Sequence, residues 1–441
     1  MDHPEFERDE QAMEARRLRR LEQKRRRQLQ QRIVLGVVVV IFVLAIVLIV
    51  RGCSGQKNKQ QEQPQASAPD TSAQAPLPQV EPDTVITLAA VGDIMVYDEQ
   101  IAAAKQPDGS YDFSDCFSAV SALTMGADFT VGNLELNFCG EPYSGKPDFR
   151  APESLALALK EKGFDLLQTA NTYSIQNGIS GLKSTIKYLN TVGIDHVGTY
   201  VAEDDKKTNE GVLLKNINGI KIAFLGYTKG VNNISLPEGS EFSVDLLYKD
   251  YDSEYKEVNT DAIVRSVKAA KALGPDLIVA MLHWGSEWDT TIIPTQKTIT
   301  DLMLENGVDI ILGSHSHVVG PMTQVPVTTV DGEEKTCFVA YSLGNFLSSP
   351  DSQKYDYAME SVILNLQITK NGSTGETSLT GISYTPLYIL KTESEVEGTH
   401  YQVVPIRSAI TNNLFPDMTE TFTAAIAHLR TNTGSDFDSG K

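Results

Sequence analysis

Val85–Met95 reads VITLAAVGDIM, a short apolar run that ends in a glycine and an aspartate. The same design recurs along the chain, where later apolar runs lead into polar residues in the segments 128–135, 164–171, 222–228, 277–283, 310–315 and 338–345. Between these runs lie stretches with helical spacing, such as Leu182, Ile186 and Leu189, which would share one helix face. Short buried strands that alternate with helices predict a layered α/β fold.

The polar residues stand at equivalent places, at the carboxyl ends of the predicted strands. Ligands of α/β sheets bind in the crevice at that edge, so residues far apart in sequence should converge there. The candidates form a mixed set of carboxylate, amide and imidazole side chains: Asp93, Glu135, Asn171, His283, His315 and His317. Such oxygen and nitrogen ligands suit Zn²⁺, Mn²⁺ or Fe²⁺. Six ligands exceed one tetrahedral site, whereas two ions that share a bridging carboxylate would use them all and would bind a phosphate-like oxyanion.

Six motifs carry a resemblance to a known family. They are GDIM (92–95), GNLE (132–135), AN (170–171), LHWGSEW (282–288), GSHSH (313–317) and YSLGNF (341–346). In this order they resemble the CapA family, which is linked to poly-γ-glutamate capsule biosynthesis, and the resemblance continues more loosely to about residue 406. It implies a calcineurin-like metallophosphoesterase domain over residues 85–350, built as a four-layer α/β/β/α sandwich with the site at one edge.

The resemblance also implies roles for the candidates. Asp93 looks like the first-metal carboxylate, Glu135 like the bridging carboxylate and Asn171 like the amide ligand. The three histidines resemble the imidazole ligands, and His283 is also a catalytic candidate.

Two positions depart from the usual metallophosphoesterase pattern. Met95 stands where that pattern has a histidine, as CapA members generally show, which predicts that one metal site is weaker. Tyr173 stands where the family has the histidine of Asn-Asn-His, beside the scissile oxygen. A tyrosine, with an ordinary pKa near 10, can donate a hydrogen bond there but carries no positive charge at neutral pH. Tyr173 is the second catalytic candidate.

Three further residues are predicted to contact substrate, each with an alternative role. Trp284 could line a substrate groove or pack beneath the His283 loop. Glu287 could contact substrate or support a metal ligand. Asn345 could touch substrate or cap its own loop.

The N-terminal part predicts a membrane anchor. Ile33–Val50 is an uncharged run of eighteen residues, enough to cross a hydrocarbon core of about 30 Å. Nine basic residues and one acid lie within Arg16–Arg32, so the positive-inside rule places segment 1–32 in the cytoplasm, against anionic lipid, and the rest of the chain outside the cell membrane. A cleaved signal peptide is the alternative, but 32 residues before the apolar run make an unusually long leader. The Gln-, Pro-, Ser- and Ala-rich stretch 51–84 predicts a flexible tether.

The charge excludes one class of partner. The formal net charge of the chain is −19. Residues 1–32 have ten Lys/Arg and seven Asp/Glu and so contribute +3, which leaves −22 for the rest of the chain. A body this acidic is unsuited to bind nucleic acid, whose phosphates need Lys and Arg contacts. Four cysteines without CxxC spacing are too few for a disulfide scaffold; either Cys116 and Cys139 form a bridge or they are free.

Beyond residue 350, alternating runs between about 359 and 406 predict β-hairpins packed on the sandwich, and a helix is expected near 418–429. Two functions remain open. The first is a metal-dependent, phosphoesterase-like hydrolase that acts on an anionic envelope polymer or its precursor. The second is a non-catalytic, metal-containing component that binds or guides such a polymer, with a polymer synthase or export complex as partner.

Overall fold

The computed structural model describes residues 81–350, 354–355, 357–394 and 398–440, which belong to one compact unit spanning residues 78–441. The predicted cytoplasmic segment 1–32, the predicted anchor 33–50 and nearly all of the predicted tether 51–84 lie outside the described residues. None of the helices within the described ranges is long and apolar enough to cross a membrane.

The first sheet has eight strands and is mixed. In spatial order it contains β14 (Gly398–Pro405), β13 (Thr377–Ser394), β12 (Glu360–Lys370), β1 (Thr84–Ile94), β2 (Phe129–Leu134), β3 (Leu166–Gln168) and β4 (Asp195–Val197), and the short β11 (Asn345–Leu347) also pairs with β1. Strands β1 to β4 run parallel, so their carboxyl ends share one edge. Strands β12 to β14 are antiparallel additions on the other side of β1.

The second sheet has six strands. Its order is β5 (Leu213–Ile217), β6 (Ile220–Thr228), β7 (Leu277–His283), β8 (Ile310–Ser314), β10 (Glu334–Ala340) and β9 (Met322–Thr328). The four central strands are parallel. This sheet therefore also brings several strand ends to one edge.

The two sheets pack face to face. Leu88 and Val131 of the first sheet belong to the same buried cluster as Val279 of the second, and the rings of Phe129 and Phe224 stack across the interface with centroids 5.5 Å apart. Side chains alternate along β1, where Leu88 faces this inner cluster and its neighbour Ala89 faces the opposite one. Because both faces are covered, the central strands are apolar throughout.

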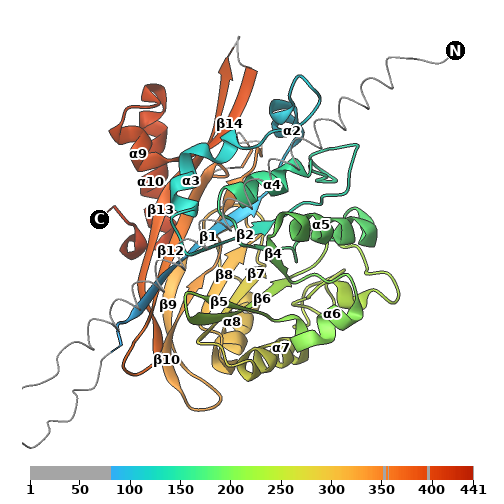
Figure 1. The fold of residues 1–441 in the computed structure, drawn as a ribbon, viewed down its shortest axis with the longest axis vertical. Helices are drawn as coiled ribbons and strands as arrows, with labels where there is room; N and C mark the ends of the chain where they lie inside the picture. The colour runs from blue at the N-terminus through green and yellow to red at the C-terminus, as the bar shows by residue number, and fades with distance from the viewer. Residues whose placement is uncertain (1–80, 351–353, 356, 395–397, 441) are drawn as a thin grey trace, which may run out of the picture. The chain divides into compact units, whose positions relative to one another are not determined.

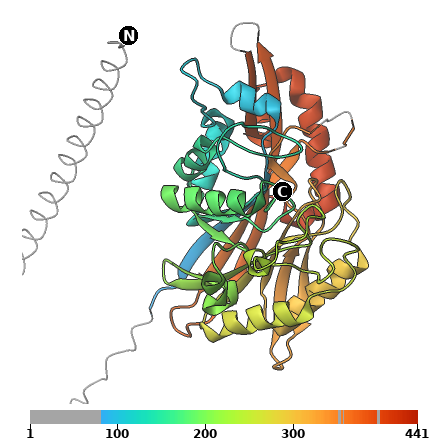
Figure 2. The same ribbon diagram turned by 90° about the vertical axis from the view of Figure 1, so that its right-hand side faces the viewer.

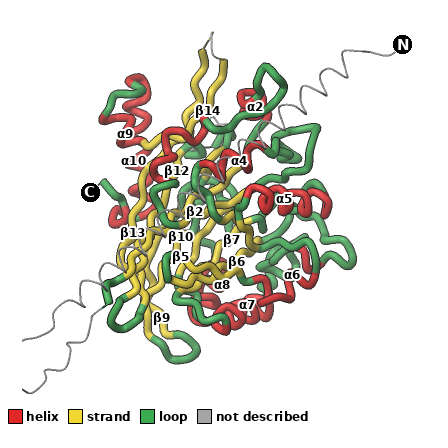
Figure 3. The backbone as a smooth tube through the Cα atoms, in the orientation of Figure 1, coloured by secondary structure: helices red, strands yellow, loops and turns green. Residues whose placement is uncertain are grey.

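Helices cover both outer faces, as Figures 1 and 3 show around the central strands. Over the first sheet pack α2 (Asp98–Ala104), α4 (Ser154–Glu161), the end of α5 (Gly178–Val192) and the 3₁₀ helix Asp115–Val120, followed by the short α3 (Ser121–Thr124). Over the second sheet pack α7 (Thr260–Ala272) and α8 (Pro294–Asn306). The short α6 (Glu203–Lys207) precedes β5. The predicted mixed α/β class is confirmed, with two sheets.

The C-terminal strands extend the first sheet. β12 pairs with β1 along most of its length, from Thr84 with Lys370 to Ala90 with Leu364, so the consecutive antiparallel strands β12, β13 and β14 continue this sheet. The last helices, α9 (Ile406–Thr411) and α10 (Thr419–Thr433), contribute Phe422 to the inner cluster. Figure 2 shows α10 alongside the long C-terminal strands.

The cysteines of the described residues form no bridge. Cys116 and Cys139 are half-buried and free, and Cys337 is buried and free. Of the two alternatives open from the sequence, the structure shows free thiols.

Candidate metal centre

Both sheets deliver side chains to one place. Asp93 is the next-to-last residue of β1, and Glu135 follows the last residue of β2. From the second sheet, His283 ends β7 and His315 follows β8. All four are buried. The expected convergence of strand ends is therefore present, although Asp93 and His283 lie within their strands rather than beyond them.

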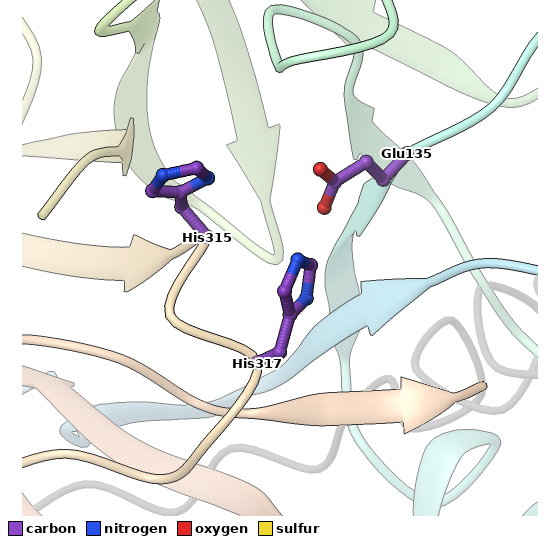
Figure 4. Close-up of side chains that lie close together, drawn as sticks. All are labelled: Glu135, His315 and His317. Carbon is purple, nitrogen blue, oxygen red and sulfur yellow. The ribbon is translucent and has the colours of Figure 1, made fainter. Parts of the chain in front are cut away.

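The ligand atoms form two overlapping groups, each of which could hold a metal ion. One group is Asp93, Glu135 and His283, and the other is Glu135, His315 and His317. Within each group the atoms lie within 4.8 Å of one another. Figure 4 shows the Glu135 carboxylate pointing toward the two imidazoles, which come from the loop after β8. Since Glu135 belongs to both groups, it has the position that a bridging carboxylate needs.

The carboxylate of Glu135 is incompletely satisfied by the protein. Its Oε1 atom is buried and has no hydrogen-bond partner. His283 Nε2 lies 3.3 Å from that oxygen, without the geometry of a hydrogen bond. Because a buried carboxylate oxygen without a partner is costly, this atom fits a site that takes a cation. Together with the imidazoles, it makes the donor set suitable for a divalent metal.

Asn133 holds the acidic side of the cluster together and was missed in the sequence. Its Nδ2 atom donates to Asp93 Oδ1 at 2.7 Å and to Glu135 Oε2 at 3.3 Å. One signal was available, since Asn133 belongs to the GNLE motif and faces the same strand edge as Glu135.

Ser314 and Thr172 were also missed, and both contact the histidines. Ser314 Oγ lies 3.0 Å from His283 Nδ1, which leaves His283 Nε2 facing the cluster. Thr172 Oγ1 lies 2.9 Å from that Nε2 atom and 3.4 Å from His315 Nδ1. Partners of this kind fix the orientation of a metal-binding imidazole.

Asn345 is placed behind the cluster. It is fully buried, its Oδ1 lies 3.1 Å from His317 Nδ1, and its Nδ2 donates to the carbonyl of Ala358 at 3.0 Å. His317 Nδ1 also lies 3.0 Å from Asp93 Oδ2. The Asn345 side chain is therefore enclosed and orients His317, and its contact with substrate stays a prediction.

The loop that carries two of the histidines is strained. His315 has a backbone φ of 91° and His317 a backbone φ of 60°. Residues other than glycine rarely adopt positive φ values. The His315 N–H donates to Asp93 Oδ2 at 3.3 Å, which ties this loop to β1. Strain of this kind persists only where the surroundings hold it, and it is typical of functional sites.

The charges in the cluster depend on one another. Burial alone would raise the pKa of Asp93, but the hydrogen bond and charge of His317, the charge of His283 and the Asn133 hydrogen bond lower it below its usual range. Burial likewise lowers the pKa of His317, but Glu135 and Asp93 outweigh that effect and raise it to about 9. Burial, reinforced by His283, Lys229 and His317, lowers the pKa of His315 well below its usual value. The carboxylates thus require nearby positive charge, which either a protonated His317 or a metal ion supplies.

Asn171 lies beside the cluster. Its Nδ2 donates to the Leu134 carbonyl at 2.7 Å, and its Oδ1 accepts from the Tyr173 N–H at 3.1 Å. The amide oxygen is therefore engaged by its own loop in this conformation, and its assignment as a metal ligand stays a prediction.

Tyr173 is buried, with its ring 4.5 Å from that of Phe149. Burial and the charges of Glu135 and Glu287 raise its pKa above the ordinary value, so its phenol is neutral near the cluster. Met95 is also buried, in the apolar cluster on the outer face of the first sheet.

The two other predicted substrate contacts lie in different surroundings. Trp284 is 1% exposed, stacks on Tyr341 and donates its Nε1–H to the Tyr341 carbonyl at 3.0 Å. It packs as a core residue in this structure, as the packing alternative describes, and its contact with substrate stays a prediction. Glu287 is exposed and lines a cavity of about 320 Å³ beside the cluster. Its role in substrate binding stays a prediction.

That cavity reaches His315. His315 and Thr172 form part of its wall, together with Ser286 from the loop after β7 and Lys229 from the loop after β6. Nearby, Trp288 stacks on Tyr355 with centroids 4.0 Å apart and lies 5.0 Å from the His317 ring. A ligand in this cavity would therefore lie against His315, one of the three histidines that could hold a metal.

Comparison with known proteins identifies the family. The model of the bacterial capsule synthesis protein PGA_cap family matches residues 87–350. The chain belongs to this family. The match covers all the residues of the buried cluster, and it confirms the resemblance to CapA that the sequence motifs indicated.

Two CapA relatives extend the match. The capsule biosynthesis protein CapA of Bacillus anthracis is 28% identical over 312 residues, which cover 69% of this chain and 68% of the relative. The PGA biosynthesis protein CapA of Bacillus subtilis (strain 168) is 26% identical over 317 residues, which cover 70% of this chain and 74% of the relative.

Solved structures give weaker likenesses. A phosphatase from Mycoplasma pneumoniae shares 12% identity with a TM-score of 0.39 and covers 69% of this chain and 94% of its own. A 5'-nucleotidase precursor from Thermus thermophilus shares 14% identity with a TM-score of 0.38 and covers 69% and 54%. TM-scores this low do not establish a common activity.

Proposed function

We propose that this PGA_cap protein is a membrane-anchored, metal-dependent hydrolase of the metallophosphoesterase type, which acts outside the cell membrane on an anionic capsule polymer or its precursor. One observation carries the proposal: Glu135 belongs to two buried groups of potential metal ligands, and His315 of the second group lines a cavity. A structural metal site would be closed, whereas a catalytic site keeps access to a ligand.

The residues present fit one or two divalent ions such as Zn²⁺, Mn²⁺ or Fe²⁺. Asp93, Glu135 and His283 would hold one, and Glu135, His315 and His317 a second. When bound, such ions supply Lewis-acid polarisation of an oxyanion and activation of water.

The chain's own groups prepare this site. Ser314 fixes His283, and Asn345 fixes His317, so that both imidazoles keep one orientation. The Thr172 hydroxyl stands at the cavity wall between His283 and His315. It is placed to exchange a hydrogen bond with a bound substrate. Burial of the acidic side chains keeps bulk water away from the cluster and strengthens its electrostatic interactions.

Two residues favour a second function, binding or guidance of the polymer without hydrolysis. Met95 has no side-chain nitrogen to offer a metal ion, and it packs in an apolar cluster. Tyr173 offers a neutral phenol in place of an imidazole. Both changes leave metal binding in place but weaken the case for fast phosphoester cleavage.

Exchange of Tyr173 for histidine separates the two functions. We expect Tyr173→His to raise the turnover of a phosphodiester at least about tenfold on metal-loaded protein, because general acid–base assistance is worth roughly 10²–10⁴ in rate. The metal content, measured in parallel, should not change. Tyr173→Phe is the matched control, since it keeps the ring that packs on Phe149 and should leave the slow wild-type rate nearly unchanged. A fast wild type that both substitutions slow would instead make Tyr173 an adapted catalytic group and remove the main support for the binding function.

The sequence supports a location outside the cell membrane. The basic residues before Ile33 and the apolar run that follows them predict that the N-terminus is cytoplasmic and the domain external. An external position suits a protein that meets a capsule polymer, and the partners we propose are that polymer and a synthase or export complex.

Thiol labelling of intact cells tests this topology. A membrane-impermeant maleimide should label Cys53, which follows the predicted anchor. The Cys53→Ser variant gives the background, because the three other cysteines are half-buried or buried. Labelling of Cys53 only after lysis would contradict the topology, once mass spectrometry shows that the thiol carries no lipid.

A further inference from the structure

Lys229 is a cation held at the wall of the cavity. It follows the last residue of β6, and its backbone N–H donates to the carbonyl of His283 at 2.8 Å. Its ammonium donates to the Gly285 carbonyl at 2.9 Å and lies 4.7 Å from the centroid of the Tyr255 ring. Both ends of Lys229 are therefore fixed to the segment that carries His283.

The surroundings of this ammonium are poor in direct ionic contacts among the residues that the structure describes. Within the described residues no Asp or Glu forms an ion pair with Lys229, although the chain beyond residue 32 has a net charge of −22. The side chain is half-buried, and this burial lowers its pKa, an effect that the charge of Glu287 only partly offsets. Glu287 lines the same cavity but forms no ion pair with this ammonium, so the partly buried cation can still take an anionic ligand.

Neighbouring parts of the cavity wall are also held in place, several of them on the same loop as Lys229. Asn232 and Asn233 both have positive φ, 57° and 54°. Asn232 donates to Gln176 Oε1 at 2.8 Å, and Asn233 Oδ1 accepts from the Tyr255 hydroxyl. Gly230 must be a glycine, since a Cβ there would lie 2.4 Å from the Tyr251 carbonyl oxygen. The cavity thus has hydrogen-bonding groups in fixed positions, which favours a specific ligand over a diffuse counter-ion.

The cavity connects this cation to the candidate metal centre. Lys229 and His315 both line it, at a volume of about 320 Å³, which is at the small end of ligand-binding pockets. A substrate whose reactive group lies against His315 would place the next part of its chain beside Lys229.

We infer that Lys229, with Asn233 and Tyr255, forms a subsite for a second, singly charged oxyanion of the substrate, next to the group bound at the metal centre. The ligand class is a polymer with one anionic group per repeat, either a carboxylate chain or a phosphodiester chain. The inference rests on the proposed function in that it uses the same site, but it requires binding only and not turnover. Lys229 is accordingly a positioning residue rather than a catalytic one.

Binding measurements on the full chain in detergent, loaded with Mn²⁺, test the subsite. We expect Lys229→Met, which keeps most of the aliphatic stem, to weaken binding of a γ-linked glutamate oligomer at least about tenfold, since a charge-assisted hydrogen bond is lost. Lys229→Arg should restore most of the affinity. Lys183→Met, at an exposed position on α5, is the control and should bind as wild type, and all variants should hold equal amounts of Mn²⁺.

Two ligand series identify the anion. A glycerol-phosphate oligomer and a γ-glutamate oligomer are compared, each beside an analogue with its charge masked by methylation. If Lys229→Met loses affinity for only one of the two charged oligomers, the result supports the subsite and identifies the anion. An equal loss of affinity for charged and masked ligands, or unchanged affinity for both charged oligomers, contradicts the subsite. If no variant hydrolyses any substrate but the charge-specific loss is present, the hydrolase proposal fails and the subsite stands. If hydrolysis occurs and its KM is unchanged in Lys229→Met, the subsite fails alone.

Discussion

Replacement of His315 and His317 together by alanine should remove nearly all the bound Zn, Mn or Fe from the purified chain, measured by elemental analysis against a wild type that holds up to about two equivalents. These imidazoles face Glu135 from one loop, and solvent cannot replace them at equal affinity. Any hydrolysis should fall on the order of 10³-fold or more, since a bound ion stabilises the transition state by several kcal/mol.

His196→Ala is the matched control for this experiment. His196 lies on β4, outside the two candidate ligand groups, so its removal tests for a general effect of losing a histidine. A double variant with full metal content would show that the cluster does not bind the metal. A variant that keeps one equivalent would show that Asp93, Glu135 and His283 hold an ion without the loop after β8.

Gly92→Ala should destabilise the fold by about 3–5 kcal/mol, among the largest effects expected of a single substitution. A Cβ at residue 92 would lie 1.9 Å from the Gly344 carbonyl oxygen, and that oxygen accepts the Asp93 N–H at 2.9 Å. The clash therefore separates β1 from the loop before β11 and moves Asp93 as well. We expect a lower urea midpoint and a reduced metal content.

Gly320→Ala provides the comparison, because a Cβ there meets its nearest neighbour, the Ser342 nitrogen, at an ordinary 3.4 Å. Its urea midpoint should stay near that of wild type. An unchanged midpoint for Gly92→Ala would mean that the contact between β1 and the Gly344 loop is looser than the structure indicates.

The sequence predicted the strands and the convergence of their ends for a physical reason. Strands covered on both faces, such as β1 and β7, are continuous apolar runs, and the polar residues at their ends stand out against them. Asp93, Glu135 and His283 could therefore be selected without coordinates. The chemistry of imidazole and carboxylate then pointed to a divalent metal.

The contacts behind the candidate ligands could not be predicted in this way. Asn133, Ser314 and Thr172 act through the direction of a single side chain, which strand spacing does not determine. The role of Trp284 stayed open for the same reason, since a tryptophan beside a site can face either the groove or the core. The order of the strands within each sheet could not be predicted either, because apolar strands carry little information about their neighbours.

The position of β1 has a consequence for how the protein is made. This strand lies between β2 and β12, and its first residue, Thr84, pairs with Lys370. The strand that carries Asp93 is synthesised before most of the domain, whereas its antiparallel neighbour β12 follows only after β2 to β11. Pairing across such a distance closes a long loop and is slow. For a protein that we propose is exported, the chain would cross the membrane before the first sheet is complete, and the metal would be acquired from the medium on the far side rather than from the cytoplasm.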